Sequence, residues 1–525
     1  STSIILSNNT LSKEMIGMKK IGYLLAVVLL LVMVGVVWAE TSPVPGASST
    51  NFLVQNMATG SGENAAIVVE YYDTAGNLTY TNSSVVLSPK ATWEFKIKNE
   101  PLPAGFEGSA IVSSDRSVAA VANIKNVNVP GASDGITQAA YNGSATGVDT
   151  LYFPSFWASA NIGSRVTIQN TENAAVDIEL AIFDRNGVAQ GVKQATLPAY
   201  GSRTFCACDP DDLPPGFPEA FGDGSVLVTG PSGAKLAGAS TATWPSRSAA
   251  YQALTDANKG TTLYVPSHFR TYFGGDSDFT LFSAINIQNT STTTPAPVTI
   301  EYYNRQTGAL DLTLTKTIPP NSAIGANTKG GGSFDAADFE VLNNTPGTAD
   351  QRWDGSVIVT SDNAIDLVGT AVTNWGTTQK SGMSALVTDA DASDVLFLPA
   401  QFRLDFGAGQ GISQWSSLNL QNVGGSTIDK SDLVIEYVDT EGVTVGTFTG
   451  ASLPFDLEAG AALGLNTKGG GDVDKTAFDS FPTQDGYPRY KGGLYITGPA
   501  GSKLIATSNI IYLDRAAVYN GVPGQ

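Results

Sequence analysis

One strand–turn pattern occurs four times in this chain and limits what the chain can fold into. Each copy is a short run rich in β-branched, aromatic or other apolar residues, followed by Asp or Asn and then by Gly, at residues 68–76, 180–187, 300–308 and 435–442. The Asp or Asn side chain can hydrogen-bond the backbone ahead of it, and Gly accepts the positive φ that a hairpin turn requires. The pattern therefore predicts four β-hairpins of one kind.

Two further landmarks accompany each hairpin in the same order. A strand ending in Gln-Asn comes before it, with Gln at positions 55, 169, 288 and 421, so successive copies are 114, 119 and 133 residues apart. A strand led by Gly comes after it, starting at positions 108, 224, 355 and 493. Ordered landmarks in four copies indicate an internal repeat, with modules at residues 40–148, 149–260, 261–393 and 394–525.

Each module holds about seven short strands with frequent turn signals, which is typical of a β-sandwich. Three modules also carry a strand with proline, Pro154, Pro266 or Pro399, before the Gln-Asn strand, and the first module lacks it. Proline cannot donate to a sheet ladder, so we expect an edge strand or a bulge there. The predicted fold class is all-β, with four tandem immunoglobulin-like β-sandwich domains after an N-terminal signal helix.

From Thr50 to Tyr519 the chain resembles tandem Ig-like β-sandwich repeat proteins of bacterial cell surfaces. The resemblance is one of architecture, because the buried Trp and the Cys pair of antibody domains are absent. It implies a rod of modules in series, each folded on its own core, with short linkers that set reach and stiffness.

The N-terminal segment predicts export. Met18-Lys19-Lys20 is a short basic stretch, an apolar run extends to Trp38, and Ala39 fits the small-residue rule for cleavage. We expect a signal peptide within residues 1–39, and an uncleaved membrane anchor is the alternative. The expected location is extracellular or at the cell surface.

The net charge of -19, from 48 acidic and 29 basic residues, argues against nucleic-acid binding. We expect an exported, non-enzymatic structural or adhesive protein whose partners are other cell-surface components or glycans. Contact with a membrane would come only through an uncleaved signal segment. A carbohydrate-binding module array and, less favoured, a secreted hydrolase with a carboxylate pair are the alternatives.

Three aromatic residues are the candidate site residues. Trp244, Trp375 and Tyr512 occupy one position after a strand of small residues, where the first module has Asn126. Aromatic rings in a loop at a module's end can stack on sugars or pack against a neighbouring module, and the second is the simpler interpretation.

The other polar residues give no catalytic or cofactor site. Glu70, Glu301 and Glu436 recur at one hairpin position, as expected for the outward face of a strand rather than for a reaction centre. His268, the one histidine, is expected at the surface. Acidic runs at residues 389–394 and 209–212 partly match a Ca²⁺ ligand pattern but lack the EF-hand Gly and closing Glu, so a structural Ca²⁺ stays open.

Two remaining features have structural interpretations. Cys206 and Cys208 face the same side of a strand at i and i+2, so a disulfide between them would be strained, although export favours oxidation. Modules three and four share an Asn-Thr-Lys-Gly-Gly-Gly insertion at residues 327–332 and 466–471. An acidic segment that is compatible with a helix follows each insertion. Because Lys precedes the glycines, the insertion departs from a phosphate-binding loop and predicts a flexible loop.

Overall fold

The computed structural model describes residues 47–129, 131–132, 134–218, 221–272, 279–343, 350–376, 380–406, 411–513 and 515–524. Their regular structure consists of β-strands and short 3₁₀-helices, so the fold is all-β, as predicted. The predicted signal peptide lies outside the described residues. Within the described ranges, no helix is long and apolar enough to cross a membrane.

Strands β1–β7, which we call unit 1, form two separate sheets. The sheet orders are β4-β1-β6-β7 and β3-β2-β5. The Gln-Asn landmark ends β1, and the hairpin landmark joins β2 to β3. The elements of unit 1 are β1 (Ala47–Asn56), β2 (Ala65–Asp73), β3 (Leu78–Leu87), β4 (Thr92–Lys96), η1 (Ile97–Asn99), β5 (Gly108–Ser114), β6 (Val118–Val127) and β7 (Ile136–Asn142).

Strands β8–β15, unit 2, repeat this arrangement with one strand more. The added strand β8 joins the two layers into one sheet of order β11-β10-β13-β8-β9-β14-β15, with β12 paired to β9. The elements of unit 2 are β8 (Thr150–Ala158), β9 (Gly163–Asn170), β10 (Val176–Asp184), β11 (Ala189–Leu197), β12 (Ser202–Cys206), η2 (Pro210–Asp212), β13 (Gly222–Thr229), β14 (Leu236–Trp244), β15 (Arg247–Gln252) and η3 (Asp256–Asn258).

Unit 3, strands β16–β24, has the same sheet order, β19-β18-β22-β16-β17-β20-β21, and β17 also pairs with β23, which pairs with β24. Its elements are β16 (Thr262–Tyr272), β17 (Leu281–Asn289), β18 (Ala296–Asn304), β19 (Leu310–Ile318), β20 (Ala323–Asn327), β21 (Gly331–Gly332), η4 (Ala336–Phe339), β22 (Gln351–Ser361), β23 (Leu367–Trp375) and β24 (Lys380–Ala385).

Unit 4, strands β25–β35, follows the order β28-β27-β32-β25-β26-β29-β30, with β33 paired to β26 and β34. Its elements are β25 (Val395–Leu404), β26 (Gln414–Asn422), β27 (Val434–Asp439), β28 (Thr444–Phe448), η5 (Gly450–Ser452), β29 (Ala462–Asn466), β30 (Gly470–Gly471), η6 (Lys475–Phe478), β31 (Thr483–Gln484), β32 (Tyr487–Thr497), β33 (Leu504–Tyr512), β34 (Arg515–Asn520) and β35 (Val522–Pro523).

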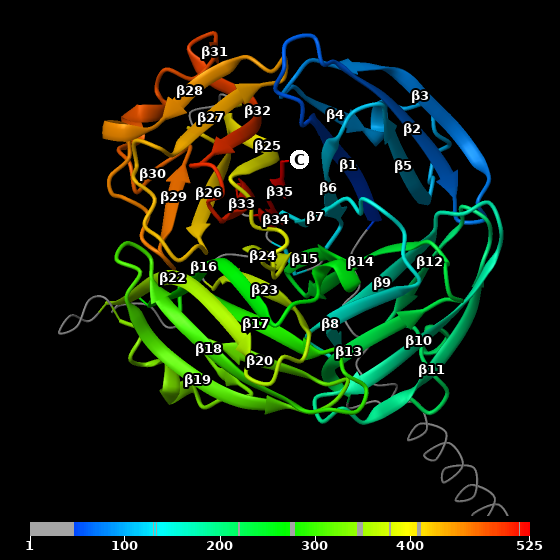
Figure 1. The fold of residues 1–525 in the computed structure, drawn as a ribbon. Coiled ribbons are helices and arrows are strands. Elements are labelled where there is room, and N and C mark those ends of the chain that lie inside the picture. Colours follow the sequence, from blue (N-terminus) through cyan, green and yellow to red (C-terminus); the bar gives the residue numbers. More distant parts are fainter. Residues whose placement is uncertain are drawn as a thin grey trace, which may run out of the picture.

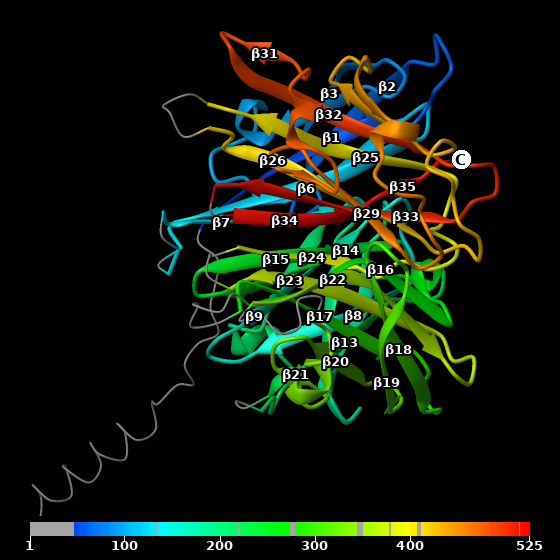
Figure 2. The ribbon, with the colours of Figure 1, turned by 90° about the vertical axis from the view of Figure 1, so that its left-hand side faces the viewer.

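The four units form a closed ring and not a rod. Figure 1 shows them around a centre, where one inner strand of each unit, β7, β15, β24 or β34, meets the others, and Figure 2 shows the ring from the side. The expected rod is wrong because unit 4 contacts unit 1 directly: Lys90 of unit 1 pairs with Glu436 of unit 4 at 2.6 Å. Small side chains such as Ala139, Ala249 and Ala517 let the inner strands approach closely.

The cores are shared between units as well. Leu53, Val121 and Ala140 of unit 1 belong to the apolar cluster of unit 4, and Val372 and Met383 of unit 3 belong to that of unit 2. Each unit still has a main apolar cluster of its own, and two of the four clusters also take in residues of a neighbouring unit. Apolar residues at the inner edge of units 1 and 3 are buried by the preceding unit, so the ring and the cores stabilise each other.

One backbone contact recurs between consecutive units around the ring; we call each of these contacts a seam. The hairpin glycine of one unit, with φ between 64° and 87°, lies against a backbone carbonyl of the next unit. A Cβ on it would lie 1.8–2.6 Å from that oxygen, so only glycine fits. The pairs are Gly76 with Ala199, Gly187 with Pro320, Gly308 with Ala459 and Gly442 with Pro89.

The residue after each of these carbonyls also has a positive φ. It is Tyr200 (56°), Asn321 (57°), Gly460 (80°) or Lys90 (62°). Non-glycine residues are uncommon in this backbone region, so their recurrence at one position marks a turn geometry that all four units share.

The strands with proline, β8, β16 and β25, are central strands, so the edge-strand expectation is wrong. Each lies between the Gly-led strand and the Gln-Asn strand of its unit. The pairing register shifts at the proline, for example between Val265 and His268 opposite β22. The predicted bulge is therefore confirmed, and it removes the need for the missing proline N–H.

Candidate binding surfaces

The three predicted aromatic residues lie at strand ends, on hairpins that lead into the inner strands. Trp244 ends β14, Trp375 ends β23 and Tyr512 ends β33, and each faces a basic residue across its hairpin, Arg247, Lys380 or Arg515. These hairpins lie at the opposite end of the inner strands from the C-terminus (Figure 2). All three aromatic side chains are half-buried.

Each ring that has a described stacking partner finds it within its own unit. The Trp244 ring centroid is 6.1 Å from that of Trp157, and the Arg247 guanidinium lies 5.3 Å from the Trp244 ring. The Tyr512 ring lies 6.0 Å from Phe406, a residue with 54% of its surface exposed. The rings therefore form small aromatic–cationic groups at this end of the ring.

Contacts between units lie directly beside these rings. Asn126, the counterpart in unit 1, is buried and donates its Nδ2 to Ser248 of unit 2 at 3.0 Å. The backbone N–H of Gly131 donates to the carbonyl of Pro245 at 3.1 Å. Arg515, which stacks on Tyr512, pairs with Asp134 of unit 1. The repeat position of these aromatic residues therefore contributes to contacts between units. The exposed parts of the rings form an accessible surface beside those contacts.

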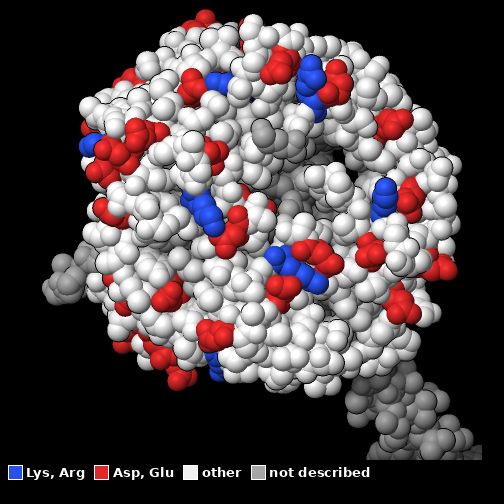
Figure 3. Space-filling view, in the orientation of Figure 1, with Lys and Arg blue, Asp and Glu red and all other residues white. Residues whose placement is uncertain are grey.

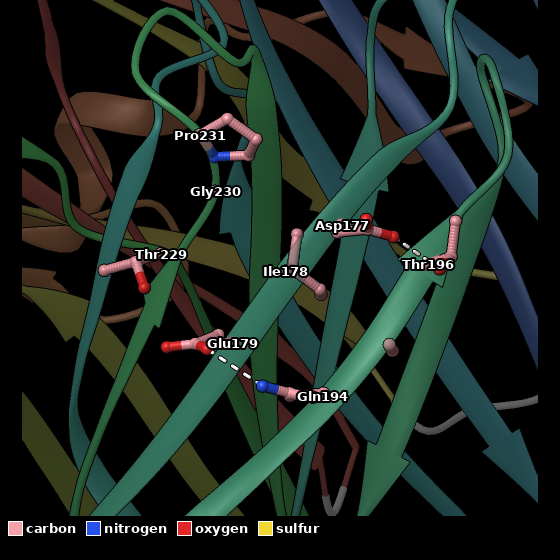
Figure 4. Close-up of a pocket in the computed structure, with 9 residues that line it drawn as sticks. Asp177, Ile178, Glu179, Gln194, Thr196, Thr229, Gly230 and Pro231 are labelled. Atoms are coloured by element: carbon pink, nitrogen blue, oxygen red, sulfur yellow. Dashed lines mark hydrogen bonds between the residues drawn. The ribbon is translucent and has the colours of Figure 1, made fainter.

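Two shallow grooves lie on the outer hairpins of units 2 and 3. The larger has a volume of about 580 Å³ and lies over β10 and β11 (Figure 4). Its carboxylates are hydrogen-bonded across the strand pair, Asp177 to Thr196 at 2.5 Å and Glu179 to Gln194 at 3.0 Å. The second, about 440 Å³, lies at the equivalent place over β18 and β19, beside Lys316. These surfaces offer hydrogen-bond partners to a polar ligand.

Glu70 and Glu301 each hydrogen-bond to the tyrosine two residues further along the strand, whereas Glu436 has a partner in another unit. Glu301 accepts from the Tyr303 hydroxyl at 2.9 Å, and burial with this hydrogen bond raises the pKa of Tyr303 to about 12. Glu436 pairs with Lys90 across the seam from unit 4 to unit 1. These glutamates hold neighbouring side chains in place.

The acidic runs are occupied by local hydrogen bonds. Asp391 accepts from the Thr388 backbone N–H at 2.9 Å, and burial raises the pKa of this carboxyl group. Asp389 pairs with Lys503 at 2.9 Å, and Asp212 pairs with Arg203 at 3.2 Å. In the part of the chain that the structure describes, no three His, Cys, Asp or Glu residues are grouped so that they could hold a metal ion.

His268 is not at the surface, so that expectation is wrong. It lies in β16, fully buried, with its ring centroid 5.6 Å from that of Tyr302 and no hydrogen-bond partner for either ring nitrogen. Burial lowers its pKa to about 3, so the imidazole is neutral. The register shift after Pro266 turns this position into the core, which the sequence pattern does not reveal.

The cysteine pair and the glycine-rich insertions serve the local structure. Cys206 and Cys208 form a disulfide across the turn after β12, with their Cα atoms 5.0 Å apart. The insertions are ordered, not flexible as expected: β21 and β30 pair with β20 and β29. The helix-compatible pieces contain 3₁₀-helices that bury Phe339 and Phe478 against Tyr302 and Tyr437.

Comparisons with known proteins give no family. No family model matches the chain, and no curated protein matches it. Among solved structures, the crystal structure of dimeric latent PorU from Porphyromonas gingivalis aligns at 9% identity over 65% of this chain and 30% of that chain, with a TM-score of 0.12. The chain thus spans less than a third of PorU, and a likeness this low carries no argument.

Proposed function

We propose that this chain is an exported, non-enzymatic structural or adhesive protein of the cell surface, built from four β-sandwich units of the Ig-like type. The main support for the proposal is that the residues repeated in all four units build contacts between units and fill the cores. The hairpin glycines and the positive-φ turns pack the units against each other at all four seams, and the copied apolar residues fill the cores. A repeated residue that builds a seam in every unit has a structural role.

The surface fits this role. Acidic side chains are dispersed over the face shown in Figure 3, with fewer basic ones among them. Dispersed like charges favour solubility outside the cell and disfavour nonspecific binding to nucleic acid. The grooves in units 2 and 3 do not favour a hydrolase, because the carboxylates in the larger one are hydrogen-bonded to neutral side chains.

Cell fractionation tests the proposal. The chain should be produced with its own leader, and its distribution among cytoplasm, membrane, envelope and medium followed by immunoblot. We expect it in the envelope or the medium, shortened by the mass of the leader, and accessible to protease added to intact cells. A full-length, protease-protected cytoplasmic protein would refute the proposal.

Glycan binding is a second candidate because of the aromatic groups at one end of the ring. Trp157 with Trp244, and exposed Phe406 with Tyr512, offer ring faces beside basic side chains, which suits stacking on sugar rings. A glycan array should then give hits that Trp244→Ala and Trp375→Ala abolish. Trp93→Ala is the matched control, because Trp93 is 48% exposed on unit 1, away from these hairpins.

A further inference from the structure

Unit 1 lacks one strand that the other three units have. In units 2–4 the strands with proline fill the position between the Gly-led strand and the Gln-Asn strand. In unit 1 the Gly-led strand is β5, and it pairs with β2 on one edge alone among the described residues. Within the described part of the chain, the two sheets of unit 1 are therefore not joined, and the second edge of β5 has no partner strand.

The open position leaves part of the unit 1 core uncovered. Val112 of β5 is half-exposed, whereas its counterparts Val228, Val359 and Ile496 are completely buried. Figure 3 shows a hollow in the front face at the place where Figure 1 separates β5 from β1 and β6. This hollow corresponds to the position that β8, β16 and β25 occupy in the other units.

The edge of β5 also lacks the features that protect exposed edges. Its seven residues, from Gly108 to Ser114, contain no charged residue and no proline. Natural proteins usually block a free edge with lysine, proline, a bulge or a covering segment, because an open ladder pairs with other chains. An unpaired strand edge beside a partly exposed core can accept an additional strand from another chain. In such β-strand addition, main-chain hydrogen bonds give affinity and alternate side chains give specificity.

The other units specify the chemistry of the strand that would fit. Leu151, Leu263 and Leu396 pair with the counterparts of Val112, and Phe153, Val265 and Leu398 are buried beside them. The occupant is thus an extended segment with leucine, an aromatic residue, a second apolar residue and then proline.

The chain just before β1 does not have this pattern. After cleavage at Ala39, the residues that remain ahead of β1 are Glu-Thr-Ser-Pro-Val-Pro-Gly, with two prolines and one large apolar residue. Proline removes ladder donors, so this stretch is a poor partner for β5.

We propose that the open edge of β5 binds an extended β-strand supplied by a separate polypeptide, completing unit 1. The proposal deepens the proposed function, on which it rests, by assigning the surface through which the protein joins a partner. The bound strand runs antiparallel to β5, as β8, β16 and β25 run to their neighbours.

A peptide with the sequence of residues 262–272, the β16 strand, tests the proposal on purified protein that begins at Glu40. Fluorescence anisotropy should show saturable binding, and the peptide with Tyr264→Asp and Val265→Asp should bind at least about ten-fold more weakly, since two buried apolar contacts are lost. Lack of saturable binding by the unaltered peptide would overturn the proposal.

Disulfide trapping then tests the register. In unit 3, Tyr264 lies opposite Ile358, whose counterpart in unit 1 is Ile111. Protein with Ile111→Cys should therefore crosslink to peptide with Tyr264→Cys, and more slowly to peptide with Val265→Cys. Leu227→Cys is the matched control, because β8 occupies that edge in unit 2.

Two results, one from disulfide trapping and one from binding after proteolysis, would refute the inference. Equal crosslinking at Cys in position 227 would show nonspecific pairing. Binding that occurs only after proteolytic removal of the residues before Ala47 would show that the same chain already covers β5. Because these measurements use purified protein, they are independent of the fractionation result on localisation.

Discussion

The seam between unit 4 and unit 1 differs from the other three seams because no chain segment joins its two units. The backbone contact is the same in all four: a glycine of positive φ lies against a carbonyl of the next unit. The side chains around it are different. Among the described residues, three ion pairs join units 4 and 1: Lys90–Glu436 at 2.6 Å, Lys491–Glu94 at 2.5 Å, and Arg515–Asp134 at the hairpins of the inner strands.

The seams along the chain use other contacts. Between units 1 and 2, Tyr72 stacks on Tyr200 with ring centroids 4.8 Å apart. Between units 2 and 3, Arg185 donates to Asn286 at 3.1 Å, and between units 3 and 4, its counterpart Arg305 pairs with Asp472 at 3.1 Å. The comparison shows that all four seams share one docking geometry, whereas their side-chain contacts are only partly shared: an arginine at the same position serves the second and third seams, and the first seam and the closing seam, between units 4 and 1, use other residues.

The largest expected effect breaks the closing seam at its backbone contact. Gly442 has a φ of 87°, and a Cβ would lie 2.2 Å from the Pro89 carbonyl oxygen. We expect Gly442→Val to lower the free energy of unfolding by about 4 kcal/mol, from left-handed backbone strain and overpacking together. Urea denaturation measures the loss, and small-angle scattering should show a larger radius of gyration as the ring opens.

Two further substitutions separate the causes. Gly450 has a φ of 52° with no atom within 4 Å of a built Cβ, so Gly450→Val should cost about 1.5 kcal/mol from strain alone. Gly76→Val creates a tighter clash, with the Cβ 1.8 Å from the Ala199 carbonyl oxygen, but the chain still tethers units 1 and 2, so we expect a smaller loss of stability than at Gly442. A loss at Gly76 as large as that at Gly442 would mean that the local clash, and not the missing covalent link, sets the cost.

The second prediction concerns acid destabilisation of unit 3 through its buried histidine. His268 is neutral in the fold with a pKa of about 3, against an ordinary value of 6.5, so the unfolded chain binds more protons between these values. Stability is therefore lost as the pH falls from 6.5 toward 3. At pH 4 we expect His268→Phe, which matches Phe156 of unit 2, to be relatively more stable by about 3 kcal/mol.

The measurement is the difference in unfolding free energy between the two proteins as a function of pH. Both proteins share all carboxylates, so the difference isolates the imidazole. At pH 7.5 the two curves should run parallel. A constant difference down to pH 4 would show that the fold does not hold His268 neutral and would contradict the prediction.

The third prediction concerns the charges of the closing seam. Lys90 and Lys491 are half-buried, and the Lys90 ammonium also lies 3.9 Å from the Tyr495 ring centroid. The double substitution Lys90→Met with Lys491→Met should cost about 1–2 kcal/mol at low salt. It should also flatten the fall in melting temperature between about 0.02 M and about 1 M salt, because salt screens such pairs.

Arg203→Met is the matched control, since the Arg203–Asp212 pair lies within unit 2. We expect it to change the salt dependence of melting less than the double substitution does, because it removes one ion pair and not two. A wild-type melting temperature that does not respond to salt would mean that packing, and not charge, closes the ring.

The sequence predicted what is local and failed where distant parts of the chain meet. The four hairpins, the Gln-Asn strands and the bulge at Pro266 follow from turn chemistry and from the missing proline N–H. Ring closure joins Lys90 to Glu436, 346 residues apart, and no periodicity marks such a pair. A rod and a ring share the same local pattern and differ only in long-range contacts.

The candidate site shows the same limit. The shared position of Trp244, Trp375 and Tyr512 was visible in the sequence, because all three end the strand of small residues. The ring contacts of Trp244 with Trp157 and of Tyr512 with Phe406 were not visible, because Trp157 and Phe406 come from another hairpin of the unit. The positive-φ turn at Lys90 and Tyr200 was missed because neither residue type signals it.

The smallest expected effect tests whether seams can exchange side chains. Tyr200 keeps a φ of 56° and stacks on Tyr72, whereas its counterpart Gly460 has no side chain and receives Tyr303 directly. Tyr200→Gly should relieve about 1–2 kcal/mol of backbone strain and lose about 1 kcal/mol of ring stacking, plus some entropy of the unfolded chain. The net change in unfolding free energy should therefore be close to zero.

Tyr72→Ala, which removes the stacking and keeps the strain, is the control and should be clearly destabilising. A large loss in Tyr200→Gly would show that the seam between units 1 and 2 depends on its own side chains more than on the docking geometry that all four seams share.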